Sequence, residues 1–187
     1  MEEDFKKTKY FKYLLSNLEE FERNFDEFNN QISEFLTAQS DDLAIVLKCH
    51  LTLEYYIDLY LQTAYPTVST WETARLTFNQ KLELINNPKT PMRFYYKGIK
   101  SLNSLRNKFS HKLNYKVKPS DYEEISRTMA VWYKAMGETQ PVGMKLIERF
   151  TTWVCASINS YINGIKKQSK ELGLSGYLQW LEKMQET

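Results

Sequence analysis

The chain has 187 residues, and its 25 lysines and arginines against 23 aspartates and glutamates give a net charge of +2. Its content of 42% hydrophobic and 26% charged residues is that of a globular protein and excludes a disordered one, and its length suits a single compact domain. No apolar stretch reaches the ~18 residues of a membrane-spanning helix, and the first residues lack the apolar core of a secretory signal. We therefore expect a cytoplasmic protein, whose two cysteines are buried thiols rather than a single disulfide.

A phenylalanine-rich heptad pattern predicts one long N-terminal helix within residues 1–40. Its apolar positions alternate at spacings of three and four and are Phe11, Leu14, Leu18, Phe21, Phe25, Phe28, Ile32 and Phe35. Charged and polar residues fill the intervals. We expect this seam to pack onto the body of the protein, with packing across a dimer as the alternative.

A second helix is predicted from Asp41 and Asp42, which can cap it, to about Tyr65. Apolar residues cover most of its circumference, which is typical of a central, buried helix. His50 and Glu54 are its polar exceptions. We expect His50 to be a core or rim histidine bonded to the backbone, and Glu54 to pair with an arginine from elsewhere, because an unpaired buried carboxylate is costly.

The rest of the chain also has helical periodicity, and no alternating strand pattern is present. Ser69 and Glu72 form a capping box for a short helix through Ile85, and Thr90-Pro91 starts the next, which continues to Leu113. A second capping box at 120–123 predicts a helix to about Met136. Residues 137–143 form the best boundary, followed by C-terminal helices within 144–187, one through Ile165 and one over 175–185.

These elements predict an all-α bundle in one domain, with residues 41–136 as its core. We expect the N-terminal helix of residues 1–40 and the C-terminal helices of residues 144–187 to decorate that core.

The segment between Glu83 and Asp121 has no acidic residue, although the whole chain is nearly neutral. It contains nine basic residues, which are Lys89, Arg93, Lys97, Lys100, Arg106, Lys108, Lys112, Lys116 and Lys118. A basic strip of this kind attracts phosphates.

Within this strip, residues 105–113 read Leu-Arg-Asn-Lys-Phe-Ser-His-Lys-Leu at the end of an amphipathic helical pattern. Arg106 and His111 are five positions apart, so on a regular helix they lie about 140° apart around the axis. They converge only if the helix ends or loosens near Ser110, or if a second copy of the motif faces the first. Asn107 and His111 are four apart and share a face.

These residue types suit RNA cleavage without a metal or other cofactor. Histidine exchanges protons near neutral pH, and arginine binds a phosphate through two parallel hydrogen bonds. One of them would transfer the proton while the other stabilises charge on the phosphorane, and Asn107 would orient the imidazole or bind the phosphate. The residues expected to follow the RNA backbone or to stack on bases are Lys97, Lys100, Lys108, Lys112, Tyr95, Tyr96 and Tyr115.

Residues 105–111 resemble the signature of the HEPN superfamily, in which a polar residue usually follows an arginine and a histidine comes after four to six positions. The helix with Glu54 and the later stretch Phe78-Asn-Gln-Lys-Leu-Glu-Leu84 are similar to uncharacterised bacterial members, so the resemblance covers about residues 41–135. It implies a helical bundle that forms homodimers in which two motifs share one cleft. It also implies a metal-independent endoribonuclease of toxin–antitoxin or phage-defence type, with Arg106 and His111 as the catalytic pair and Asn107 at the polar position.

The alternative is a non-catalytic helical interaction or regulatory module, a partner in a defence or toxin system. In that case Arg106 pairs with Glu54 or a similar acid, and His111 caps the helix C-terminus, where a positive charge is favoured. The sequence has no Cys/His cluster with zinc-ligand spacing and no glycine-rich phosphate loop. These absences argue against a zinc site and against a nucleoside triphosphatase.

Overall fold

The computed structural model describes residues 42–66, 68, 71, 73–86, 92–112 and 115–186, with side chains described as far as residue 167. Over these residues the elements are five α-helices, numbered α4 to α8, and one 3₁₀ turn, η1, and there is no strand. The predicted all-α class is confirmed. The predicted N-terminal helix within residues 1–40 lies outside the described residues.

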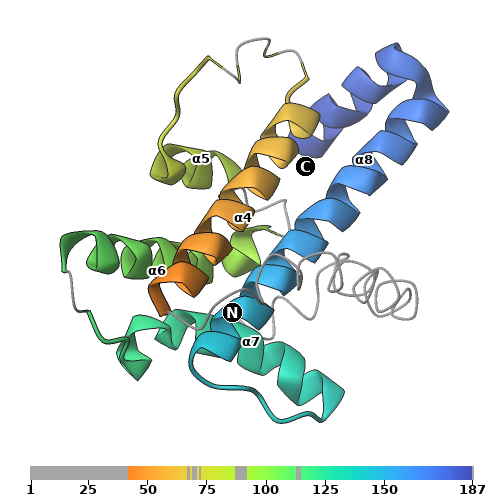
Figure 1. The fold of residues 1–187 in the computed structure, drawn as a ribbon. Coiled ribbons are helices and arrows are strands. Elements are labelled where there is room, and N and C mark those ends of the chain that lie inside the picture. Colours follow the sequence, from red (N-terminus) through yellow and green to blue (C-terminus); the bar gives the residue numbers. More distant parts are fainter. Residues whose placement is uncertain are drawn as a thin grey trace.

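Two long helices form the centre of the molecule. α4 (Asp42–Ala64) and the first part of α8 (Met144–Glu186) lie side by side (Figure 1). Both carry fully buried side chains, such as Leu53 on α4 and Val154 on α8. The expectation that the C-terminal helices only decorate the core is therefore wrong for the first part of α8. The predicted division of this region into two helices is also wrong, since α8 is one element whose ribbon bends before the C-terminus.

Polar residues within α8 kept its burial from being predicted from the sequence. Every residue from Phe150 to Ile158 is buried, although Thr151, Thr152 and Ser157 are among them. The two threonine hydroxyls donate to carbonyl oxygens one turn earlier, Thr151 to Ile147 at 2.9 Å and Thr152 to Glu148 at 3.0 Å. Because these hydroxyls are satisfied within their own helix, they can enter the core at little cost.

α5 (Phe78–Ile85) begins later than predicted. Residues 73–77 are not helical, so the helix does not start at a capping box formed by Ser69 and Glu72. The capping box is instead Thr77 with Gln80, in which the Thr77 hydroxyl accepts from the Gln80 amide and the Gln80 side chain accepts from the Thr77 amide. The predicted end of the helix before Asn86 is confirmed.

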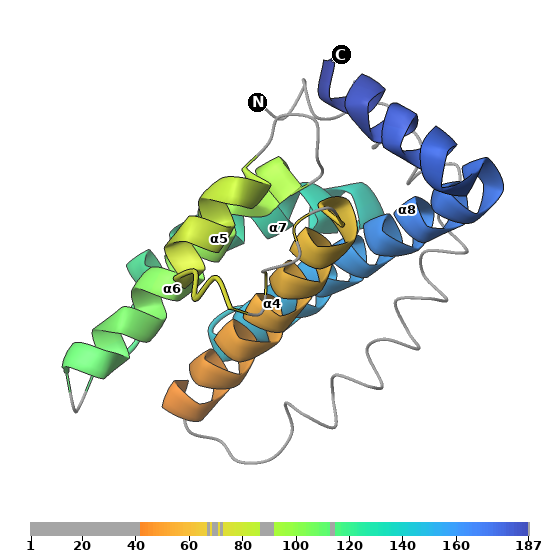
Figure 2. The same cartoon turned by 90° about the horizontal axis from the view of Figure 1, so that it is seen from above.

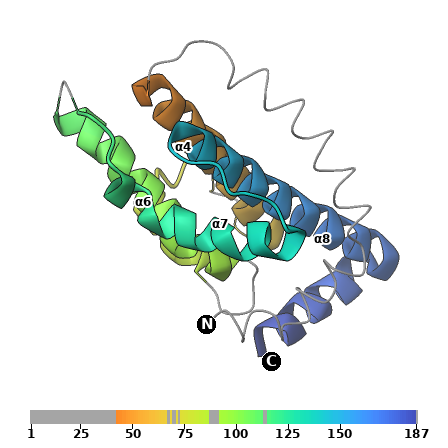
Figure 3. The same cartoon turned by 90° about the horizontal axis from the view of Figure 1, so that it is seen from below.

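α6 (Met92–His111) and α7 (Glu123–Met136) lie together on one side of the α4 and α8 pair (Figures 2 and 3). α6 ends two residues before the predicted Leu113. α7 begins close to the predicted position, but the Ser120 capping box is wrong, because η1 (Pro119–Asp121) occupies these residues and no side chain caps α7. α7 ends as predicted, at Gly137 with a φ of 70°.

Residues 137–143 connect α7 to α8 within one core, because α8 packs against α4, α6 and α7. α6 lies close to α8 at Gly98, where an added Cβ would lie 2.6 Å from Cζ of Phe150. Cys49 and Cys155 are buried, free thiols, as expected. Burial raises the pKa of Cys49 to about 12 and also raises the pKa of Cys155. Among the described residues, no helix combines the length and apolarity that crossing a membrane requires.

Candidate nucleic-acid interface

The outward face of α6 carries a row of exposed basic side chains. Arg93, Lys97, Lys100, Lys108 and His111 are all exposed and follow one another at spacings of three, four or eight residues, which places them on one side of the helix. Figure 2 shows the last turns of α6 at the edge of the molecule, away from α8. Apart from Arg106, the predicted basic residues of α6 therefore lie on a single solvent-facing side.

Most of these cations have no carboxylate partner. In the part of the chain that the structure describes, Arg93, Lys97 and Lys100 form no ion pair, and Lys112 forms none either. Lys100 lies over the ring of Tyr96, with Nζ 5.6 Å from the ring centroid. Cations that have no carboxylate partner hold only counterions, which a phosphate backbone can displace.

The motif residues Arg106 and His111 lie on different sides of α6. The helix is α-helical through His111 and does not loosen at Ser110, so the two residues are about 140° apart around the axis. His111 is exposed among the basic row, whereas Arg106 is half-buried on the side toward the core residues Ile99 and Leu102. Within one chain, the local geometry therefore does not bring the two side chains to one phosphate.

The Arg106 guanidinium donates a hydrogen bond to the side chain of the next residue, Asn107. Its Nη1 donates to Oδ1 of Asn107 at 3.1 Å, and its backbone carbonyl accepts from the Ser110 hydroxyl at 3.2 Å. Asn107 is thus engaged by the guanidinium while it shares a face with His111, four residues on. Among the described residues Arg106 pairs with no acid, so the ion pair between Arg106 and Glu54 that the alternative reading expected is absent.

The polar partner of Glu54 is a lysine. Lys81 Nζ donates to Oε1 of Glu54 at 2.9 Å and to Oδ2 of Asp58 at 2.8 Å. The expected arginine is therefore wrong, although the need for a cation was predicted correctly. This arrangement joins α5 to α4 and leaves Arg106 free of that role.

His50 is the centre of a buried polar cluster that the sequence did not predict. Its Nε2 lies 3.0 Å from Oδ1 of Asn103, whose Nδ2 donates to Oδ1 of Asn79 at 2.8 Å. The His50 ring packs against Phe78, with centroids 4.2 Å apart. His50 is a core histidine, as expected, but its partner is the side chain of Asn103 rather than the backbone. His50 and Asn103 are 53 positions apart in the sequence, so no local pattern predicts that they meet.

Burial holds His50 in its neutral form. It lowers the pKa of His50 below the ordinary value of 6.5, and the positive charges of Arg106 and Lys81 lower it further, whereas Asn103 and Glu54 oppose the shift. Glu54 Oε2 is 4.0 Å from Nδ1 of His50. Asn103, the hydrogen-bond partner of His50, lies three positions before Arg106 on α6, so Arg106 is on the His50 side of the helix rather than on the side of His111.

Two predicted RNA contacts, Lys108 and Tyr115, are engaged by a buried carboxylate. Lys108 Nζ lies 2.5 Å from Oδ1 of Asp121, and the Tyr115 hydroxyl donates to both carboxylate oxygens at 2.7 and 2.8 Å. The backbone amide of Lys118 adds a third donor at 2.7 Å. These contacts hold Tyr115, Lys118 and Asp121 against the end of α6, so Lys108 and Tyr115 already have a structural role.

The tyrosines expected to stack on bases differ in exposure. Tyr95 is wrong for that role, because it is fully buried and its hydroxyl lies 3.0 Å from Oγ of Ser157. Tyr96 is partly exposed and donates to Glu83 at 2.5 Å. Tyr115 is partly exposed, with Nζ of Lys108 and of Lys112 each 5.8 Å from its ring centroid.

Over the described residues, no group of three or more histidine, cysteine, aspartate or glutamate side chains is arranged to hold a metal ion. No family model, curated protein or solved structure matches the chain.

Proposed function

We propose that this protein is an HEPN-like RNA-binding protein whose outward face of α6 binds the phosphate backbone. The observation that carries this proposal is the row of exposed basic side chains on that face, of which Arg93, Lys97 and Lys100 form no ion pair within the described residues. Arg93, Lys97 and Lys100 are spaced at three and four residues, so successive side chains can reach successive phosphates along one side of the helix. Lys112 is exposed directly after the helix end.

Salt-dependent RNA binding by two matched triple variants tests this interface. In Arg93→Gln/Lys97→Gln/Lys100→Gln, three cations are removed from the proposed face. In Lys134→Gln/Lys166→Gln/Lys167→Gln, three exposed cations are removed from α7 and α8 instead. We expect the first variant to lose affinity for single-stranded RNA by about tenfold at ~0.1 M salt, with a slope of log K against log salt that is smaller by about 2. Equal losses in both variants would refute a specific interface on α6.

The proposed catalytic site is formed by two copies of the chain. Because Arg106 and His111 lie about 140° apart on α6, a phosphate that meets both needs Arg106 of one protomer and His111 of the other. His111 would then deprotonate the ribose 2′-hydroxyl or protonate the leaving oxygen, and Arg106 would stabilise the charge on the phosphorane. The hydrogen bond between Arg106 and Asn107 supports a positioning role for Asn107. With such a shared site, the protein would be a metal-independent endoribonuclease that acts as a homodimer.

A complementation experiment tests the shared site directly. Arg106→Ala and His111→Ala are each expected to abolish RNA cleavage measured in EDTA. When the two variants are refolded together, half of the dimers are mixed, and each mixed dimer has one complete site, so about a quarter of the wild-type activity should return. No recovery in verified mixed dimers would refute a site shared between copies, and equal cleavage by all proteins would show that the motif is not catalytic.

The second candidate function is a non-catalytic RNA-binding or interaction module with a partner protein of the antitoxin or defence type. The inward position of Arg106, beside the His50 cluster, favours it, because an arginine in that place can serve packing of α6 against α4. RNA binding without any cleavage by the purified wild type, at concentrations at which it is dimeric, would select this function.

A further inference from the structure

The outward side of α4 carries large apolar side chains that remain exposed beside the described elements. Leu51 is 63% exposed and Tyr55 is 59% exposed, although both belong to a helix at the centre of the core. Leu47, one turn before Leu51, is half-buried. These three residues follow one another at spacings of four and form a continuous strip, here called the α4 stripe. Single exposed apolar side chains are common on proteins, but a row of them on one helix indicates a contact surface.

The other sides of α4 are occupied by described helices. α8 lies along one side of α4, and α5 and α6 lie on another (Figure 2). Lys81 of α5 joins the two helices through Glu54 and Asp58 of α4. Leu53, which points into the core, is fully buried. Among the sides of α4, the one with the α4 stripe is therefore the one on which a further helix can pack.

The chain before Asp42 has the length and the apolar pattern to cover this side. As a helix, the heptad seam of residues 11–35 would be about 36 Å long, and α4, with 23 residues, is about 34 Å long. Only residues 36–41 separate the seam from α4. Helices joined by a connection of about two to eight residues are usually antiparallel neighbours.

This short connection also sets which residues would meet. With Phe35 opposite Asp42, each step back along the seam corresponds to one step forward along α4. Leu51 is nine positions after Asp42, so it would lie opposite the position nine before Phe35, which is between Phe25 and Phe28. An exposed leucine would then enter a hole between two phenylalanines, as side chains do in coiled-coil packing.

We propose that the N-terminal segment folds back along α4 as an antiparallel helix and covers the α4 stripe with its heptad seam, within the same chain. The seam then packs in cis, and the α4 stripe is not available to a second copy. A homodimer forms through another surface, such as the end of α6 at which His111 is exposed. This inference goes beyond the proposed function and does not depend on RNA binding.

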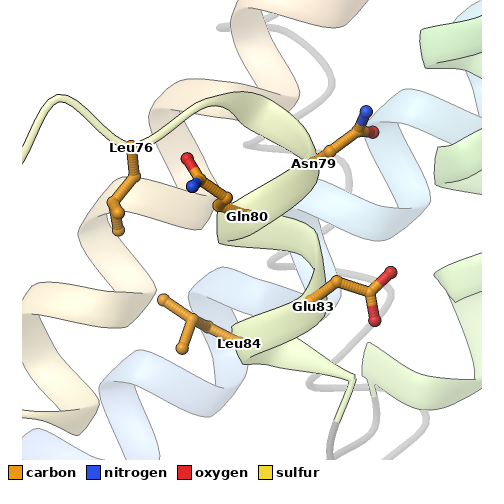
Figure 4. Close-up of a pocket in the computed structure, with 5 residues that line it drawn as sticks. All are labelled: Leu76, Asn79, Gln80, Glu83 and Leu84. Atoms are coloured by element: carbon orange, nitrogen blue, oxygen red, sulfur yellow. The ribbon is translucent and has the colours of Figure 1, made fainter.

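Disulfide trapping in the full chain tests the contact and its register. Leu51→Cys/Phe28→Cys places two thiols across the proposed interface, where a disulfide needs Cα atoms within about 7 Å of each other. Leu84→Cys/Phe28→Cys is the matched control, because Leu84 is also an exposed helical leucine but lies on α5, where it lines a surface depression (Figure 4). The native Cys49 and Cys155 are buried, and burial raises their pKa values, so they react slowly.

We expect oxidation with diamide to convert most of the Leu51→Cys/Phe28→Cys protein to an intramolecular disulfide, which migrates faster than the reduced monomer on a non-reducing gel. The control should react at least about tenfold more slowly. A disulfide-linked dimer as the main product would overturn the proposal, because the seam would then pack on a second copy. Equal rates in both variants, or no disulfide in either folded variant, would overturn it as well.

Leu51→Gln and Leu84→Gln supply a second measurement that introduces no thiol. Both replace an exposed helical leucine by a residue of similar helix propensity. If the seam covers Leu51, glutamine there places a polar group under the phenylalanines and lowers Tm by about 3–6 °C. Leu84→Gln remains in solvent and should change Tm by less than about 2 °C. Equal Tm values for the two variants would overturn docking of the seam on α4.

Discussion

Substitution of Gly98 by alanine is the sharpest test of how α6 is seated on the core. The added Cβ would lie 2.6 Å from Cζ and 2.7 Å from Cε2 of Phe150, and carbon atoms pack at about 3.5–4.0 Å, so one side must move by about 1 Å. Phe150 is fully buried and cannot swing into solvent. The overpacking costs about 1–3 kcal/mol, which outweighs the gain of about 1 kcal/mol from replacing a helical glycine.

Gly164→Ala is the matched control, because Gly164 is also helical and its added Cβ would meet no atom within 4 Å. We expect Gly164→Ala to be more stable than wild type by up to about 1 kcal/mol, and Gly98→Ala to be less stable by about 1 kcal/mol. The difference of about 2 kcal/mol corresponds to about 4–8 °C in Tm for a chain of this size. Urea unfolding followed by circular dichroism measures it, with an unchanged m-value as the check on the unfolding mechanism.

Phe150→Leu in the Gly98→Ala background supplies the internal test of the cause. If the ring of Phe150 is what the new methyl group meets, Gly98→Ala should cost less when residue 150 is leucine, and the double-mutant cycle should show coupling. A steric clash between residue 98 and Phe150 is excluded if Gly98→Ala is as stable as Gly164→Ala. It is also excluded if Gly98→Ala costs the same in both backgrounds.

Two further predictions concern the buried polar groups. Because burial lowers the pKa of His50 in the folded chain, the unfolded chain binds the extra proton at a higher pH than the folded chain does. The wild type should therefore lose stability as the pH falls below 6.5, the ordinary pKa of histidine, and His50→Gln should lose less. Equal pH dependence of the free energy of unfolding in the two proteins would contradict this. Asp121→Asn should cost about 1–3 kcal/mol at pH 7, since a buried carboxylate loses its pairing with Lys108, whereas Glu123→Gln, which affects only an exposed pair with Arg127, should cost about 0–1 kcal/mol. Urea unfolding of both variants provides the comparison, and equal costs would show that Asp121 adds nothing beyond a surface ion pair.

Elements whose signals are local could be predicted from the order of the residues alone. Gly137 ends α7 because glycine, which has no Cβ, readily adopts the left-handed φ of 70° found there. The apolar spacing of α6 follows from the period of a helix whose hydrogen bonds join residues four apart. The angle of about 140° between Arg106 and His111 also follows from helix geometry alone. Local signals can still mislead: Ser69 with Glu72 and Thr77 with Gln80 both match the capping-box pattern, and only the second opens α5.

The pairing of polar groups between elements depends on how the helices pack and could not be predicted from the sequence. Asn103 as the partner of His50, Lys81 as the partner of Glu54, and Asp121 as the acceptor for Lys108 and Tyr115 all join different elements. No periodicity specifies such pairs, because they depend on how far each helix lies from its neighbours and how it is rotated about its axis. The same packing turned Arg106 toward the core and left His111 in solvent, since the apolar face of α6 must be buried against α4 and α8.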